Sequence, residues 1–204
     1  MILLAIGAHP DDIEYGCGGA LITYQQQGHT VYCLVLTTGD KGGDPAVRKK
    51  EQLDAARLMG VEQVFWGGYE DTEIPVSREL IQEIEKIVHT VRPSMVFVNY
   101  LDDTHQDHRN LAHAVSSATR YTHNVLFYEV PTTYNFVPPV FVDIAPVIHK
   151  KLAALEAHAS QMGKTNIEGA NILELAQATA TFRGVQGRVK LAEAFMPLRF
   201  FLTS

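Results

Sequence analysis

The sequence predicts an α/β fold of the Rossmann-like, doubly wound class, with helices on both faces of a mostly parallel sheet. Two observations support this prediction. Short apolar runs alternate along the chain with segments in which apolar residues recur at helical spacing. The runs are also apolar along their whole length, as expected of strands that helices cover on both faces of a parallel sheet.

Five short apolar runs are expected to form the strands. They cover residues 2–8, 30–37, 63–66, 95–99 and 125–130. Beyond residue 130 the pattern weakens, because Pro131, Pro138 and Pro139 indicate a loop. A short sixth strand is expected after this loop, at residues 140–142.

The clearest predicted helix spans residues 77–91. Apolar residues recur there on one helical face, Ser77 suits the N-cap position, and Pro93 follows the end. The residues on this face are Leu80, Ile81, Ile84, Ile87, Val88 and Val91. A second helix is expected from Asp44, an N-cap before Pro45, to about Gly60. The remaining helices are expected at about residues 18–28, 144–159 and 171–182.

Length and composition favour one domain made of residues 1–204. The chain has 204 residues, of which 46% are hydrophobic, and this is enough for one complete core. Charged residues make up 20%, and the formal net charge is −6. Nucleic acid and anionic membranes attract basic surfaces, so neither is expected as a partner.

A cytoplasmic location is expected from the cysteines and from the first apolar run. Cys17 and Cys33 form no disulfide framework, which suits a reducing compartment, although a single bond between them stays an alternative. The run at residues 2–8 lacks the basic flank of a signal peptide and the length of a membrane span.

Two polar clusters follow the first and fourth predicted strands, at residues 9–14 and 101–108. In open α/β sheets, ligands bind beyond the carboxyl ends of the strands. We therefore expect both clusters at one rim of the sheet, where they form the functional site.

The side chains in these clusters suit a catalytic zinc site, which takes three protein ligands and leaves one position open. His9 and Asp12 are three residues apart, as are His105 and His108, so either pair can reach one ion. The neighbouring aspartates remain free for proton transfer and for orienting an imidazole; they are Asp11 and Asp107. Spacing alone does not select the three ligands, and Asp-rich loops also serve simply to cap helices.

Gly16, Gly18 and Gly19 suggest a phosphate cradle as an alternative function for the first cluster. The dinucleotide fingerprint G-x-G-x-x-G is absent, however, and a carboxylate-rich loop repels pyrophosphate. These glycines are better explained by close packing of a helix on the sheet, below the loop that carries the first polar cluster.

The two clusters resemble motifs of the LmbE-like or PIG-L family of zinc-dependent N-acetylglucosaminyl deacetylases. The strong match is Ala8-His9-Pro10-Asp11-Asp12-Ile13-Glu14, joined by Gly18-Gly19 and His105-Gln106-Asp107-His108-Arg109. Weaker matches extend over nearly the whole chain, including His158-Ala159-Ser160-Gln161. Two positions depart from the family pattern: Gln106 stands where proline is usual, and Thr72 where glycine often follows the aspartate.

The resemblance implies a role for each site residue. Three of them hold the zinc: His9, Asp12 and His108. Asp11 is the general base, and His105 stabilises the oxyanion or acts as the acid, with Asp107 hydrogen-bonded to it. His105 suits this role best if Asp107 raises its pKa and keeps it charged near pH 7. Arg48 and Asp71 match positions that face the substrate, although a solvated helix charge is the alternative for Arg48. Iron or another divalent metal suits the same ligands.

The resemblance also implies the activity. The expected protein is a hydrolase that removes the N-acetyl group from an N-acetylglucosamine-type sugar or conjugate, a small-molecule substrate, and releases acetate and an amine. The alternatives are a zinc amidase acting on a thiol conjugate or a nucleotide-linked sugar, and a non-catalytic binding module. A homo-oligomer is expected, and a hexamer is the assembly that the family suggests.

Overall fold

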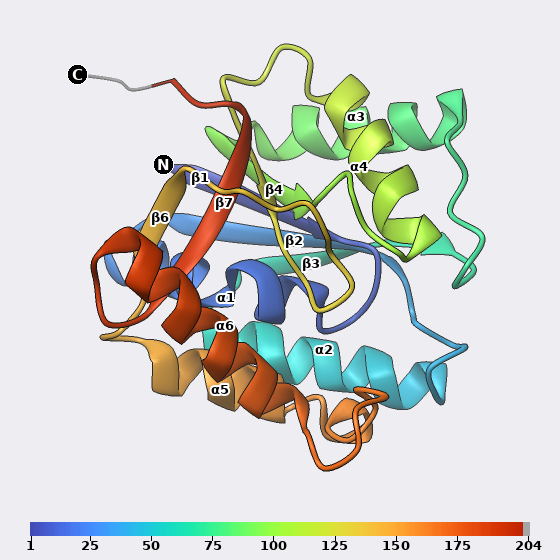
Figure 1. Cartoon of the computed structure of the whole chain (residues 1–204). Coiled ribbons are helices and arrows are strands. Elements are labelled where there is room, and N and C mark those ends of the chain that lie inside the picture. The colour runs from blue at the N-terminus through green and yellow to red at the C-terminus, as the bar shows by residue number, and fades with distance from the viewer. Residues whose placement is uncertain (202–204) are drawn as a thin grey trace.

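The computed structural model describes residues 1–201, which form one seven-stranded sheet between two layers of helices (Figure 1). The strands lie in the order β3-β2-β1-β4-β5-β7-β6. Their bounds are β1 Ile2–Gly7, β2 Thr30–Thr37, β3 Gln63–Tyr69, β4 Met95–Asn99, β5 Asn124–Tyr128, β6 Val140–Asp143 and β7 Ala192–Arg199. The pairs among β1 to β5 are parallel, whereas β7 is antiparallel to both β5 and β6. The predicted doubly wound, mostly parallel α/β fold is confirmed.

Helices cover both faces of this sheet. Their bounds are α1 Asp12–Gln26, α2 Pro45–Met59, α3 Arg78–Val91, α4 Gln106–Ala118, α5 Ile148–Glu156 and α6 Ile172–Gly187, with a 3-10 turn η1 at Ala159–Gln161. Helices α3 and α4 lie on one face, and α1, α2, α5 and α6 lie on the other (Figure 1).

Each face of the sheet has its own hydrophobic core, and neighbouring residues of one strand enter different cores. In β1, Leu3 and Ala5 pack in the core below α1, whereas Leu4 and Ile6 pack in the core below α3 and α4. All four side chains are fully buried. This two-sided burial explains why the first strand is apolar at every position.

The helix end signals are confirmed where the sequence marked them clearly. The Ser77 hydroxyl accepts a hydrogen bond from the Leu80 backbone N–H at 3.2 Å and caps α3. The Asp44 carboxylate accepts two backbone N–H groups at the start of α2. Gly60 ends α2 in the left-handed conformation, with φ 73°.

Several predicted boundaries were wrong. Helix α1 begins at Asp12 and not near residue 18, so residues 12–14 of the first polar cluster are helical. The start of α4 was predicted as part of a loop at residues 101–108, because this histidine-rich segment has no apolar start signal. Strand β7 was missed, because Glu193 and Pro197 interrupt its otherwise apolar run.

The glycines at the start of α1 bring this helix close to the sheet, as predicted. A Cβ atom added to Gly16 would lie 2.0 Å from the Tyr128 ring, so only glycine fits at this contact.

Cys17 and Cys33 are both buried and are free thiols. Within residues 1–201, no helix combines the length and the apolar character that crossing a membrane requires.

Candidate active site and metal-binding cluster

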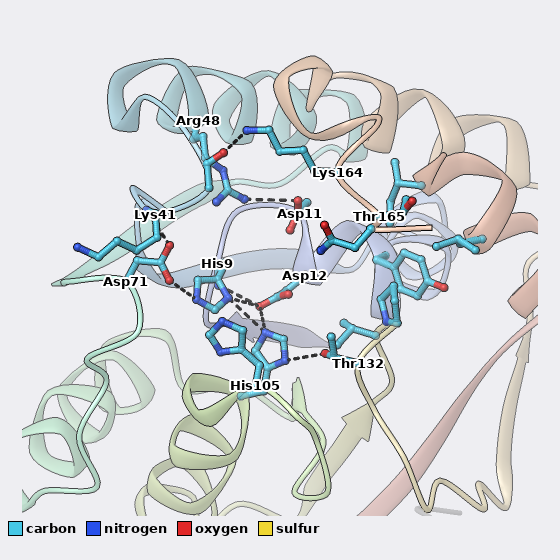
Figure 2. A pocket seen from close by; sticks show the side chains of 18 of the residues that line it. His9, Asp11, Asp12, Lys41, Arg48, Asp71, His105, Thr132, Lys164 and Thr165 are labelled. Atoms are coloured by element: carbon cyan, nitrogen blue, oxygen red, sulfur yellow. Dashed lines mark hydrogen bonds and ion pairs between the residues drawn. The ribbon is translucent and has the colours of Figure 1, made fainter. Parts of the chain in front are cut away.

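The two polar clusters meet in a cavity of about 410 Å³ beyond the carboxyl ends of β1 and β4 (Figure 2). His9, Asp11 and Asp12 enter it from the β1–α1 junction, and His105 and His108 enter it from the start of α4. Parallel strands place their carboxyl ends at one edge, so the topology brings together residues that are about 100 positions apart in sequence.

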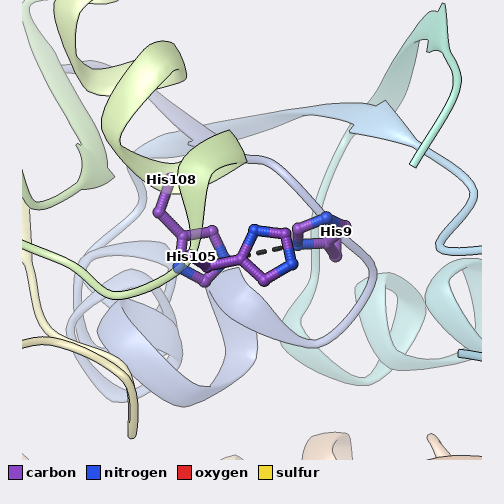
Figure 3. Close-up of side chains that lie close together, drawn as sticks. All are labelled: His9, His105 and His108. Atoms are coloured by element: carbon purple, nitrogen blue, oxygen red, sulfur yellow. Dashed lines mark hydrogen bonds between the residues drawn. The ribbon is translucent and has the colours of Figure 1, made fainter. Parts of the chain in front are cut away.

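Three ligand atoms form a small triangle at the bottom of the cavity. His9 Nδ1 lies 3.2 Å from His108 Nε2, and Asp12 Oδ2 lies 3.3 Å from His108 Nε2 and 3.6 Å from His9 Nδ1. Figure 3 shows the rings of His9, His105 and His108 gathered together, and its dashed line marks the contact between His9 and His108. The structure therefore brings together the three residues expected to hold the metal.

The size and charge of this triangle fit a divalent metal ion. Ligands at zinc–nitrogen distances of 2.0–2.1 Å in tetrahedral geometry lie about 3.3–3.4 Å apart, close to the three separations observed. The surrounding carboxylates also favour positive charge. Although burial lowers the pKa of His108, the charge of Asp12 and a hydrogen bond to Asp103 raise it to about 9. A cation bound by these three residues would take the place of the proton.

Carboxylates support the outer nitrogen of each imidazole. His9 Nε2 lies 3.0 Å from Asp71 Oδ1 and 3.1 Å from Asp107 Oδ2, and His108 Nδ1 lies 3.2 Å from Asp103 Oδ2. Such carboxylates orient histidine ligands of metals and make them more basic. Asp103 was not identified from the sequence, where it was one acidic residue among several. The pairing with His108 depends on the start of α4, which the sequence did not reveal.

The Asp107 carboxylate contacts a different residue from the one expected. The resemblance implied a hydrogen bond to His105, but the carboxylate faces His9 and also accepts the backbone N–H groups of Thr72 at 2.7 Å and Ile74 at 3.2 Å. The contact with His105 comes instead from the Asp107 backbone N–H, which donates to His105 Nδ1 at 3.2 Å. The expected side-chain contact was wrong because the first turn of α4 points this carboxylate toward His9 and the segment between β3 and α3.

A second group of potential ligands overlaps with the triangle. One ligand atom from each of His9, Asp71, His105 and Asp107 lies within 4.8 Å of the others, and His105 also lies this close to His9 and His108. In this second group His9 faces its carboxylate neighbours through Nε2. We favour the triangle, because it leaves those carboxylates in place as supports for His9.

Asp11 has an unusual backbone that directs its side chain into the cavity. It occupies the N-cap of α1 with φ 93°, but its carboxylate caps no helix N–H. The side chain keeps 27% of its surface exposed, and Oδ2 lies 3.4 Å from Arg48 Nη2 (Figure 2). Burial in this cavity raises the pKa of Asp11 to about 6, and the charge of Arg48 opposes this rise. A carboxylate with such a pKa suits a general base near neutral pH.

His105 is held as a neutral imidazole. Its Nδ1 accepts the Asp107 backbone N–H, so the ring proton of the neutral form lies on Nε2. Burial lowers the pKa of His105, and the positive charges of His9 and His108 lower it further. The expectation that Asp107 keeps His105 charged near pH 7 was wrong, because these effects outweigh the charge of that carboxylate.

Arg48 and Asp71 line the cavity, yet their polar groups are largely engaged within the protein. Arg48 is 5% exposed and donates to the carbonyl oxygens of Pro10 and Gly39, both at 2.8 Å. The alternative of a solvated helix charge was therefore wrong. Asp71 accepts the Lys41 backbone N–H at 3.0 Å in addition to its contact with His9. Their direct contact with a substrate stays a prediction.

The two departures from the family pattern have local structural consequences. Thr72 adopts φ 73°, a conformation that favours the glycine usual at this position. Its backbone N–H nevertheless donates to Asp107. Gln106 is the first residue of α4, where the proline usual in the family fits equally well.

Known deacetylases resemble this chain in sequence and in fold. An uncharacterized deacetylase of Escherichia coli K12, YaiS, is 36% identical over 167 residues, which cover 78% of this chain and 90% of that protein. The structure of the N,N'-diacetylchitobiose deacetylase from Pyrococcus horikoshii matches with a TM-score of 0.86 and 27% identity, covering 97% of this chain and 83% of that one.

The fold itself also occurs in a protein with different chemistry. The 4-carboxy-2-hydroxymuconate hydratase of Pseudomonas putida KT2440 matches with a TM-score of 0.85 over 100% of this chain and 98% of that one, but at 21% identity this likeness concerns the fold alone. Residues 4–119 match the family model described as PIG-L, GlcNAc-PI de-N-acetylase, and they include His9, Asp12 and His108. The chain therefore belongs to the PIG-L family of deacetylases.

Proposed function

We propose that this protein is a metal-dependent N-deacetylase that acts on an N-acetylglucosamine-type sugar or conjugate. The single observation that carries this proposal is the triangle of His9, Asp12 and His108 ligand atoms with the unliganded Asp11 carboxylate beside it in one cavity. Such a combination of a cation site, an adjacent base and a cavity suits the hydrolysis of an amide.

The three triangle residues would hold the metal ion, and zinc suits their nitrogen and oxygen donors. Iron suits them as well. When bound, a divalent ion polarises an amide carbonyl and lowers the pKa of water at its open position. Asp71, Asp103 and Asp107 keep the two imidazoles oriented for this role through their outer nitrogens.

Asp11 would take the proton of the attacking water and later return it to the nitrogen of the leaving amine. Water adds to the acetyl carbon, the C–N bond breaks, and the products are acetate and the free amino sugar. Its pKa of about 6 leaves most of Asp11 deprotonated at pH 7, as this role requires.

His105 would stabilise the carbonyl oxygen as negative charge builds up on it. The neutral ring carries its proton on Nε2, and within residues 1–201 no hydrogen bond engages this N–H group. A donor in such a position contributes about 3–4 kcal/mol to transition-state stabilisation. Because His105 is neutral, it serves as a hydrogen-bond donor, and Asp11 is the better source of the proton for the amine.

The walls of the cavity suit a substrate with both polar and apolar parts. The apolar residues Val130, Pro131, Ile172 and Leu175 line the cavity, and so do two exposed lysines, Lys41 and Lys164. These features are compatible with an amino sugar bearing a further group. They are equally compatible with the alternative substrates, an amide of a thiol conjugate or a nucleotide-linked sugar.

Acetate release from a panel of substrates tests the proposal. Purified protein is reconstituted with zinc or iron, and free N-acetylglucosamine, its disaccharide and its acidic conjugates are compared with amides of thiol conjugates. We expect acetate release that chelation abolishes and metal restores. Metal-loaded protein that releases no acetate from any N-acetyl sugar, but hydrolyses another amide or hydrates an unsaturated carboxylic acid, contradicts the proposal.

A further inference from the structure

Behind Asp11 lies a sealed row of polar side chains that the proposed reaction does not use. Glu14, Gln52 and His158 come from α1, α2 and the residue preceding η1, and their exposed fractions are 0%, 0% and 1%. Polar side chains are seldom buried so completely unless their hydrogen bonds serve the structure or the site.

Gln52 joins this row to the backbone of Asp11. Its Oε1 accepts the Asp11 backbone N–H at 3.3 Å, and its Nε2 donates to Glu14 Oε1 at 2.6 Å. A backbone N–H can only donate and a carboxylate can only accept, so one orientation of the amide satisfies both neighbours. Glutamine suits this position because it carries an acceptor and a donor on adjacent atoms.

Glu14 and His158, which lie at the end of the row away from Asp11, hold Gln52 in place. Glu14 Oε2 and both ring nitrogens of His158 make no hydrogen bond within the described residues, and the two side chains meet as an ion pair at 3.5 Å. A move of Gln52 would leave the buried Glu14 with this long contact alone, which is costly for a charged group. The amide is therefore confined to its place.

Asp11 requires such support because its φ of 93° is unfavourable for a residue with a side chain. Its carbonyl oxygen is held by the Tyr15 backbone N–H at 2.9 Å, and its backbone N–H is held by Gln52. This conformation directs the carboxylate into the cavity and away from the α1 amides. The orientation of the base thus depends on a glutamine from a different helix.

We propose that Gln52 is a positioning residue, which acts on the reaction through the backbone of Asp11. The proposal rests on the proposed function, in which Asp11 is the base. Gln52 itself does not line the cavity, so it has no direct contact with a substrate there. A misplaced base costs far more in rate than in binding, because substrate affinity does not depend on it.

The test compares Gln52→Met in two backgrounds, with kcat divided by the metal content of each protein. In the wild-type background we expect kcat to fall about 10- to 100-fold with KM nearly unchanged. In the Asp11→Asn background the same substitution should cause no further loss, because its effect passes through Asp11. The matched control is Gln25→Met, on the part of α1 far from the cavity, which should leave kcat unchanged.

Two further measurements keep the test decisive. Gln52→Glu retains the acceptor for the Asp11 N–H and can share one proton with Glu14, so it should restore kcat to within about threefold of wild type. Amide hydrogen exchange at Asp11 should be slow in wild type and faster in Gln52→Met. This readout holds even if no N-acetyl sugar is a substrate, so it separates a failure of the proposal from a failure of the proposed function.

An equal loss of kcat in both backgrounds would mean that Gln52 merely stabilises the fold, and would overturn the proposal. An unchanged kcat in folded Gln52→Met would do the same. If Gln52→Met does not fold, the wild-type exchange rate and Gln52→Glu decide: an Asp11 amide that exchanges as fast as an open loop, or a Gln52→Glu variant as slow as Asp11→Asn, contradicts the proposal.

Discussion

Nδ1 of His9 lies 3.2 Å from Nε2 of His108, although the two histidines are 99 positions apart in the chain. Asp12 Oδ2 lies within 3.6 Å of both nitrogen atoms. Two imidazole nitrogens and one carboxylate oxygen at this spacing are well suited to share one cation.

Removing either histidine of the triangle should abolish metal binding. We expect His9→Ala and His108→Ala to lose both metal and activity. His105→Ala should keep its metal while kcat falls about 100- to 1,000-fold, because only a hydrogen-bond donor is lost. Elemental analysis beside steady-state kinetics on the three variants checks this. A His105→Ala protein that purifies without metal would show that His105 belongs to the ligand set.

Asp103→Asn should weaken metal binding about 10- to 100-fold, because the neutral amide supports the outer nitrogen of His108 less well than the carboxylate does. Titration of the metal-free protein with zinc in the presence of a competing chelator measures this affinity. Asp102→Asn is the matched control, since the Asp102 carboxylate contacts Asn135 and not the triangle. Equal affinities for the Asp103 and Asp102 variants would argue against a supporting role for Asp103.

Arg48→Met should move the acid limb of the pH profile of kcat/KM to higher pH. The positive charge of Arg48 lowers the pKa of Asp11, so its removal raises that pKa and the base keeps its proton to higher pH. The wild-type limb should lie at or below about pH 6, since a bound cation lowers the pKa of Asp11 further. Lys50→Met, an exposed change on the same helix, should not move the limb. A rise in KM with an unmoved limb would indicate direct substrate binding by Arg48.

Gly16→Ala should destabilise the fold by about 1–3 kcal/mol, the range typical of overpacking a tight interior. The added Cβ would overlap the Tyr128 ring, which is itself fully buried. Chemical denaturation measures the free energy of unfolding. The control is Gly163→Ala, where no atom lies within 4 Å of the added Cβ. Equal stability of the two variants would mean that α1 packs less closely on the sheet than described.

The sequence was sufficient for the fold class and for the residues that meet in the cavity. Strands apolar throughout require cover on both faces, and the carboxyl ends of parallel strands must share an edge. His9 and His108 were therefore expected at one rim of the sheet, and the pairing of β1 with β4 brings them close. Helix ends are marked by Asp44, Ser77 and Gly60. Their capping depends on neighbouring residues in the chain, so it can be recognised from the sequence.

The contacts that tune the site were not predictable in the same way. Asp103, Asp71 and Gln52 act on partners that are distant in sequence or lie across a turn, and their orientation depends on packed helices. The neutral state of His105 likewise depends on a backbone N–H at the start of α4, a helix without a clear sequence signal. Such partners become visible only once the helices are placed.

Anomalous diffraction from crystals of the zinc-loaded protein tests the central claim most directly. We predict one ion bound by Nδ1 of His9, Oδ2 of Asp12 and Nε2 of His108, with Asp11 unliganded beside it. An ion bound instead to Nε2 of His9, among Asp71 and Asp107, or the absence of any ion from this cavity, would contradict it.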